Sequence, residues 1–356
     1  MTSALARSAA FCDRFGLRLP ILLAPMAGAC PPALSIAVAN AGGMGACGAL
    51  LMPPPAILAW AAEVRGAANG PFSLNLWIPD PPPVRDAARE AAVRRVLGTW
   101  GPEVPPEAGD ATTPDFDEQC EALLQAAPAA VSSIMGLFPA AFVERLKARG
   151  ITWMATVSTV AEARAAEAAG ADILVAQGAE AGGHRGRFDA ARAEAEMVGL
   201  MALVPAVVDA VRLPVVATGG IADARGVAAA LALGASAAQI GTGFLRTPEA
   251  GIAPAWAEAL GGAAPEGTRV SRVFSGRAGR SLATAYVEAA TAPDAPPPAP
   301  YPVQRGLTGA MRERGTKAGE IGRIQAWAGQ AAGLARAEPA GEIARSVWEG
   351  ARRLLA

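Results

Sequence analysis

Residues Val215–Gly243 read VVATGGIADARGVAAALALGASAAQIGTG. In this stretch a short apolar run ends in a glycine turn, an alanine-rich amphipathic segment follows, and a second apolar run again ends in glycines. The apolar runs are typical of buried strands, and the segment between them is typical of a helix that buries one face. Strand, helix and strand in this order predict two parallel strands joined by a crossover helix.

The same unit recurs along the chain. Its candidate strands are Ile21–Ala24, Met44–Cys47, Phe72–Leu76, Ala130–Ile134, Thr152–Thr156, Ile173–Ala176, Val215–Ala217 and Ala237–Ile240. Its candidate crossover helices are Pro32–Ala41, Pro139–Arg149, Thr159–Ala169, Leu200–Val211 and Ala222–Leu233. Eight such units in about 250 residues have the size of a (β/α)8 TIM barrel. A doubly wound sheet would normally show an early GxGxxG motif, which is absent. We therefore predict an α/β fold of the TIM-barrel type.

Two regions interrupt this rhythm. Residues 79–115 are dense in proline and charge, and we expect an extended insertion after the third strand that adds nothing to the core. Residues 290–302 are rich in proline and are typical of a linker. We expect the barrel at 1–246, a smaller helical cap that serves as the substrate domain with its linker at 247–302, and a C-terminal helical segment at 303–356 that packs back on the barrel.

Composition excludes several classes of function. The chain has 356 residues, enough for one large barrel or two domains, and a formal net charge of -1 at pH 7. Without a basic surplus, nucleic acid and anionic membranes are not expected partners. No stretch is long and apolar enough for a membrane span, and the N-terminus lacks the apolar core of a secretory signal, so we expect a cytoplasmic protein. The four cysteines show no CxxC spacing, and we expect no metal site.

The single histidine, His184, lies in the string QGAEAGGHRG at 177–186, directly after the apolar run Ala171–Ala176. Glycines at this point let the backbone turn sharply and approach a ligand closely. A histidine can change its protonation near neutral pH. We predict that His184 is catalytic; the alternative is a surface-loop histidine with a satisfied hydrogen bond.

In TIM barrels the chemistry takes place at the carboxyl ends of the strands. Gly219 and Gly220 follow the seventh predicted strand, and Gly241 and Thr242 follow the eighth. Many barrels hold a phosphate with backbone N–H groups at these two places, so we predict a phosphate site there. The other strand ends contribute Ala24, Pro25, Met26, Asn75, Thr156 and the loop from Gln177 to His184.

A phosphate site would serve a sugar phosphate, an indole precursor or a flavin equally well. The longer strings, in their order, resemble those of the nitronate monooxygenase family, also called 2-nitropropane dioxygenases. EAGGHRG in the loop at 177–186 is the most specific of them, and YPVQ at 301–304 and WAGQ at 327–330 resemble that family's C-terminal part. The others are APM at 24–26, AGGMG at 41–45, Asn75, ATGGI at 217–221 and QIGTG at 239–243.

This resemblance implies an FMN enzyme that oxidises alkyl nitronates, and nitroalkanes, with dioxygen to carbonyl compounds and nitrite, without NAD(P)H. It implies a homodimer too, although no heptad or interface stripe in the sequence supports one. The cofactor residues that it implies are Ala24, Pro25 and Met26 against the flavin ring, Asn75 and Gln177 at its polar edge, Thr156, Gly182 and Gly183 beside it, and Gly219, Gly220, Gln239, Gly241 and Thr242 at the ribityl phosphate.

Two roles are open for His184 beside such a flavin. A neutral imidazole would take the α-proton of a nitroalkane, and an imidazolium would pair with the nitronate oxygens. We favour the second role, because a nitronate is already deprotonated.

The C-terminal third departs from the family in one respect. The SGRAGR string at 275–280 resembles the family's arginine-containing segment, but Thr284 stands where an asparagine is expected. Arg277 and Arg280 contact an anionic substrate or the flavin phosphate in one interpretation, and form surface ion pairs in the other. Tyr301 either closes the active site or packs its ring on the barrel rim.

For three further residues a structural role is expected or is as plausible as a functional one. Trp327 and Gln330 are expected to dock the C-terminal helix. Glu180 either orients its neighbours in the loop or caps a helix locally.

Other functions stay open at the level of sequence. A flavin-dependent enoyl-acyl-carrier-protein reductase also carries a GGH loop but takes hydride from a nicotinamide. An NADH:quinone reductase of the same fold is the second enzyme alternative. A flavin-binding or scaffold protein without turnover is the third, and in it His184 would be dispensable.

Overall fold

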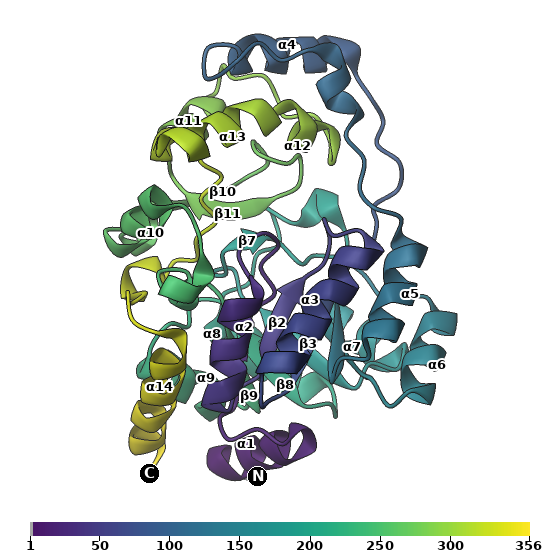
Figure 1. The fold of residues 1–356 in the computed structure, drawn as a ribbon, viewed down its shortest axis with the longest axis vertical. Coiled ribbons are helices and arrows are strands. Elements are labelled where there is room, and N and C mark those ends of the chain that lie inside the picture. Colours follow the sequence, from purple (N-terminus) through teal and green to yellow (C-terminus); the bar gives the residue numbers. More distant parts are fainter. Residues whose placement is uncertain (1–2) are drawn as a thin grey trace.

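The computed structural model describes residues 3–356 and shows an eight-stranded parallel barrel (Figure 1). The sheet has the order β1-β9-β8-β6-β5-β4-β3-β2, and a parallel bridge between Leu22 and Met44 joins its two edge strands. The predicted TIM-barrel fold is confirmed. The strands are β1 (Ile21–Leu23), β2 (Gly45–Gly48), β3 (Phe72–Trp77), β4 (Ala130–Ile134), β5 (Thr152–Val157), β6 (Ile173–Gln177), β8 (Val215–Thr218) and β9 (Ala237–Ile240).

Helix α1 (Ala4–Phe15) closes the amino-terminal end of the barrel. Its Phe11 and Cys12 are buried in one cluster with strand residues such as Leu22, Met154 and Val216. Figure 1 shows α1 at one end of the strands and the cap at the other. A ligand can therefore reach the strands only at their carboxyl ends.

The outer ring of helices is completed from the C-terminus. After β9 the chain leaves the barrel, and the long helix α14 (Ala340–Leu355) returns to pack against α9 and α2. Its apolar side, including Ile343 and Val347, is buried against the barrel. The other helices of the ring are α2 (Pro32–Ala41), α3 (Pro54–Ala67), α5 (Phe116–Ala126), α6 (Ala140–Ala148), α7 (Val160–Ala168), α8 (Leu200–Ala210) and α9 (Ala224–Ala232).

The proline-rich insertion is not merely an extended segment. It contains helix α4 (Ala87–Leu97), which the side chain of Asp86 caps by accepting from the N–H groups of residues 88 and 89. Val93 and Leu97 of α4 are buried in one cluster with Val273 and Tyr286. The insertion therefore reaches over the cap and shares its apolar core, as Figure 1 shows, and the expectation that it adds nothing to a core was wrong.

The region after the barrel contains strands as well as helices. β10 (Thr268–Ser271) and β11 (Gly279–Leu282) form an antiparallel sheet whose third strand is β7 (Gly183–His184), from the loop that follows β6. The cap is thus joined to the barrel through the strand that carries the histidine. The helices of the region are α10 (Pro254–Gly261), α11 (Ala285–Ala290), α12 (Val303–Leu307) and α13 (Gly309–Ala318).

The C-terminal segment 303–356 has two parts rather than one. Val303 and Met311, on α12 and α13, are buried in the core of the cap beneath α4, whereas α14 packs on the barrel. The sequence suggested a single segment because the proline run at 296–298 looks like a boundary. In the structure the chain crosses that run without leaving the cap.

Candidate active site

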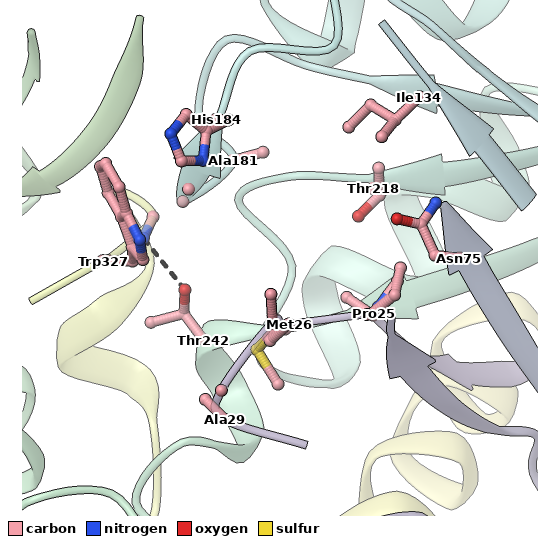
Figure 2. Close-up of a pocket in the computed structure, with 18 of the residues that line it drawn as sticks. Pro25, Met26, Ala29, Asn75, Ile134, Ala181, His184, Thr218, Thr242 and Trp327 are labelled. Atoms are coloured by element: carbon pink, nitrogen blue, oxygen red, sulfur yellow. Dashed lines mark hydrogen bonds between the residues drawn. The ribbon is translucent and has the colours of Figure 1, made fainter. Parts of the chain in front are cut away.

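A cavity of about 370 Å³ lies between the carboxyl ends of the strands and the cap. Figure 2 shows its barrel side, with Pro25, Met26 and Asn75 pointing toward the same space as His184. Every site residue expected from the sequence lines this cavity. They are Ala24, Pro25, Met26, Asn75, Thr156, Gln177, Gly182, Gly183, His184, Gly219, Gly220, Gln239, Gly241 and Thr242.

His184 is held by residues of both the barrel and the cap. Its backbone pairs with Gly279 of β11. Its ring lies between two indoles, with centroid distances of 4.6 Å to Trp77 and 4.7 Å to Trp327. Its Nε2 lies 2.8 Å from the hydroxyl oxygen of Ser275, a hydrogen-bond distance. These contacts fix the ring at the cavity wall, so the alternative of a surface-loop histidine is wrong.

The imidazole of His184 is neutral at physiological pH. Its removal from water, and after that the positive charges of Arg277, Arg185 and Arg305, together lower its pKa to about 3. An imidazolium here would face three guanidinium groups. This pKa argues against the favoured interpretation of His184 as a cationic anchor for the nitronate and favours a role for the neutral form.

Two of the nearby arginines brace the protein rather than face the cavity. Arg277 is buried, pairs with Asp80 and donates to the backbone oxygen of Arg187 at 3.1 Å. Arg280 donates to the backbone oxygen of Ala179 at 3.0 Å. The sequence left two interpretations open for these residues, contact with an anionic ligand or a surface ion pair. Neither describes them, because both are buried groups that bond to the protein itself.

Arg185 holds the loop itself. Its guanidinium donates to the backbone oxygens of Gly178 at 3.0 Å and of Ala181 at 2.6 Å. Burial lowers the pKa of Arg185 to about 9, and the neighbouring charge of Arg280 acts in the same direction. The loop that carries His184 is therefore tied together by a buried cation that bonds to carbonyl groups.

Two other groups near the loop, Glu180 and Gln177, have roles that the geometry decides. The Glu180 carboxylate accepts from the N–H of Leu200 at 2.9 Å, so it caps the start of α8 and does not orient the histidine. The Gln177 amide donates to the backbone oxygen of His184 at 3.1 Å and accepts from the N–H of Gly186 at 2.7 Å. Gln177 thus braces the loop with both ends of its amide.

Several side chains that the sequence did not single out for the site also line the cavity: Trp77 from β3 of the barrel, and Ser275, Arg305, Arg312 and Gln325 from the cap. Trp77 had a usable signal. It stands two residues after Asn75 on one strand, and residues at i and i+2 face the same side. Trp327, expected only to dock a helix, also lines the cavity. Its backbone forms an antiparallel bridge with Ser281 of β11, which holds it there.

A family model described as nitronate monooxygenase matches residues 10–350 of the chain. The chain belongs to the nitronate monooxygenase family. Members of this family are flavin-dependent oxidoreductases, so the chain is an enzyme of that class.

Relatives in this family cover almost the whole chain. A nitronate monooxygenase of Pseudomonas aeruginosa is 40% identical over 350 residues, which are 96% of this chain and 99% of the relative. A nitronate monooxygenase of Paraburkholderia phytofirmans is 38% identical over 338 residues, which are 92% of this chain and 91% of the relative.

Solved structures agree with this assignment. Nitroalkane oxidase from Streptomyces ansochromogenes matches with a TM-score of 0.87 at 36% identity, covering 98% of this chain and 100% of its own. FabK from Thermotoga maritima is more distant, with a TM-score of 0.74 at 27% identity, covering 97% of this chain and 96% of its own.

The barrel side of the cavity fits the flavin that nitronate monooxygenases use. Gly219 and Gly220 have φ angles of 117° and 67°, which favour glycine, and a Cβ at Gly219 would lie 3.0 Å from the backbone nitrogen of Ala181. Within residues 3–356 no backbone acceptor takes the N–H groups of Gly219, Gly220 or Thr242. Free N–H groups of this kind, at the ends of two neighbouring strands, suit a phosphate.

The same side offers a polar group for a ring system. The Asn75 amide nitrogen donates to the hydroxyl of Ser132 at 2.9 Å, and its oxygen points into the cavity in Figure 2. The Thr242 hydroxyl, drawn with a dashed line, accepts from the N–H of Gly329 at 3.0 Å. Thr242 thereby joins the loop after β9 to the WAGQ segment, and its hydroxyl is engaged while its backbone N–H is free.

Among residues 3–356, every helix is too short or too polar to cross a lipid bilayer.

Proposed function

We propose that this enzyme binds FMN and oxidises alkyl nitronates with dioxygen to carbonyl compounds and nitrite, without NAD(P)H. One observation carries the proposal: a neutral histidine, fixed between two indoles, shares a cavity with glycine loops whose free N–H groups suit a phosphate. When bound, the flavin supplies the electron transfer and the reaction with dioxygen.

The chain's own residues bind and orient the reactants. We assign the backbone at Gly219, Gly220, Gly241 and Thr242, with the Gln239 side chain, to the FMN phosphate. The Asn75 oxygen is assigned to the polar edge of the flavin ring. The remaining residues assigned to the ring are Ala24, Pro25, Met26, Thr156, Gln177, Gly182 and Gly183.

His184 acts as a neutral hydrogen-bonding group at the face where the substrate lies. General-base catalysis is most effective when the pKa of the base lies near the working pH. A pKa of about 3 makes His184 a weak base, which takes the α-proton of a nitroalkane but only slowly. Anionic nitronates, which need no proton removed, are therefore the better substrates, and nitroalkanes are slower ones.

The proposal includes a cytoplasmic enzyme whose partners are a small nitronate and dioxygen. It includes a homodimer, which rests on the family resemblance alone. Size-exclusion chromatography with light scattering tests the dimer, and a monomer mass would remove it from the proposal.

An anaerobic experiment tests the reaction. The purified protein is checked for flavin absorbance, identified as FMN by chromatography, and mixed without oxygen with propyl-2-nitronate or with NADH. We expect the nitronate alone to bleach the flavin, and nitrite to appear once oxygen is admitted. Bleaching by NADH alone would overturn the proposal and favour an enoyl-acyl-carrier-protein reductase or an NADH:quinone reductase.

A further inference from the structure

Two arginines of the cap face the cavity without an acidic partner. Arg305, on α12, and Arg312, on α13, line the cavity, and neither forms an ion pair with a carboxylate among residues 3–356. The fully buried arginines of this protein all have bonding partners: Arg187 and Arg277 pair with carboxylates, and Arg185 and Arg280 donate to backbone oxygens. Arg305 and Arg312 are half-buried, and partial removal of a cation from water without a counter-charge is unfavourable, so the positive charge on this wall suits an anion.

The two arginines differ in how firmly they are held. Arg312 donates to Thr308 at 3.1 Å, to the Gln325 side-chain oxygen at 2.9 Å and to the backbone oxygen of Arg305 at 2.9 Å. Burial lowers the pKa of Arg312 to about 10, and the charge of Arg305 acts in the same direction. The Arg305 guanidinium makes no hydrogen bond within the described part of the chain. Its donors are free for a ligand.

A neutral donor lies on the same wall. The Tyr301 hydroxyl is buried and has no hydrogen-bond partner among the described residues. Burial raises the pKa of Tyr301 to about 12, so the hydroxyl keeps its proton. The ring packs on Trp77 with a centroid distance of 5.6 Å, and Trp77 in turn packs on His184. A buried hydroxyl without a partner is costly, and a ligand oxygen would relieve that cost.

We propose that Arg305, assisted by the Tyr301 hydroxyl, binds the negatively charged oxygens of the nitronate and so selects the anion over the neutral nitroalkane. This role rests on the proposed function. Arg305 is the anion anchor that His184 is too weakly basic to be. Arg305 lines the same cavity as His184 and Tyr301, and its charge acts to lower the pKa of both groups.

The test uses the FMN-loaded full chain and two substrates, propyl-2-nitronate and neutral 2-nitropropane. Because a hydrogen bond to a charged group is worth about 1.5 to 3 kcal/mol, Arg305→Gln should raise the KM for the nitronate about 10- to 100-fold. The KM for 2-nitropropane should change less than about threefold, since no charge is recognised there. Arg305→Lys should recover part of the loss because it restores the charge, and Tyr301→Phe should raise the nitronate KM about 2- to 10-fold.

Arg314→Gln is the matched control. Arg314 lies on α13, is exposed and does not line the cavity, so this variant removes one positive charge from the cap without touching the site. Its nitronate KM should stay within about twofold of the unmodified enzyme, because exposed charges are screened. If Arg314→Gln and Arg305→Gln raised the nitronate KM equally, the effect would come from the overall charge of the cap, and the inference would be overturned.

A binding measurement separates this inference from the proposed function. Nitrite, a small planar anion, is titrated into the oxidised enzyme while the flavin spectrum is followed. If the enzyme does not turn over nitronates but nitrite binding is lost in Arg305→Gln, the anion site stands and the proposed function falls. If nitronate turnover is present but Arg305→Gln changes neither its KM nor nitrite binding, the inference is wrong and the proposed function stands.

Discussion

The barrel wall and the cap wall of the cavity are built from different kinds of group. The barrel wall presents backbone and small residues at strand ends, such as Gly219, Gly220 and Thr242. The cap wall presents rings and charges, such as Arg305 and Trp327. Backbone groups on rigid strands can hold one cofactor in many relatives, whereas side chains on a separate layer can change without moving the strands. The barrel wall thus suits the cofactor, and the cap wall suits the choice of substrate.

The largest effect should come from disturbing the barrel wall alone. Gly220→Val places a β-branched residue at a φ of 67° and puts a Cβ 3.1 Å from the Cβ of Glu180. Strain of this kind costs about 1 to 3 kcal/mol, so we expect the loop to move. Because this movement also displaces the N–H donors for the phosphate, the purified variant should retain less than about a tenth of its flavin. The ratio of flavin absorbance to protein absorbance measures the retained flavin.

Gly262→Val is the control for that experiment. Gly262 has an ordinary φ of -95°, and a Cβ there would meet nothing within 4 Å. This variant should keep its flavin. Full flavin occupancy in Gly220→Val would mean that the phosphate is held elsewhere.

The second effect is on His184, which belongs to both walls because β7 pairs with the cap sheet. His184→Asn should leave the flavin bound, since the phosphate loops are separate. It should lower kcat/KM for 2-nitropropane about 100-fold, because proton transfer by a positioned side chain contributes about that much. For propyl-2-nitronate the loss should be nearer about 10-fold, because no proton is removed. Equal losses for both substrates would contradict the division of roles between His184 and Arg305.

The strand ends were the part of the site that the sequence could predict. Gly219 lies where an apolar run stops at glycines and could be placed from local pattern alone, whereas Asn75 lies within the third strand, two residues before its end. The cap wall could not be predicted in this way. Arg305 reaches the cavity only because α12 packs beneath α4, a contact between segments about 200 residues apart that no local pattern encodes.

The small cap sheet was missed for a related reason. Its strands β10 and β11 are four residues each, and β7 has only two. Pairing between distant segments, and not strand propensity, creates so short a sheet. The same is true of Trp327, whose ring position depends on the backbone of β11 and not on its own helix-like surroundings.

A smaller effect concerns stability and pH. The pKa of His184 falls from 6.5 to about 3 on folding, so the unfolded chain binds a proton at pH values between these two and the folded chain does not. Above pH 6.5 His184 is neutral in both states and causes no loss of stability. Below pH 6.5 the unfolded chain gains a proton that the folded chain does not, so the free energy of unfolding falls as the pH decreases toward 3. At pH 5 this loss is about 2 kcal/mol, from a slope of about 1.4 kcal/mol per pH unit. Denaturant unfolding of the protein and of His184→Asn at several pH values should show this slope only in the former.

The smallest effect should come from Ser275, which belongs to the cap wall alone. Ser275→Ala removes the hydroxyl that lies 2.8 Å from His184 Nε2, while the two indoles still hold the ring in place. One neutral hydrogen bond is worth about 0.5 to 1.5 kcal/mol, so kcat/KM should fall about 2- to 10-fold with flavin content unchanged. Ser281→Ala is the matched control, because that buried serine of the cap bonds to the oxygen of its neighbour Leu282 and does not line the cavity. If Ser275→Ala released the flavin, the cap would contribute to cofactor binding, and the division between the two walls would not hold.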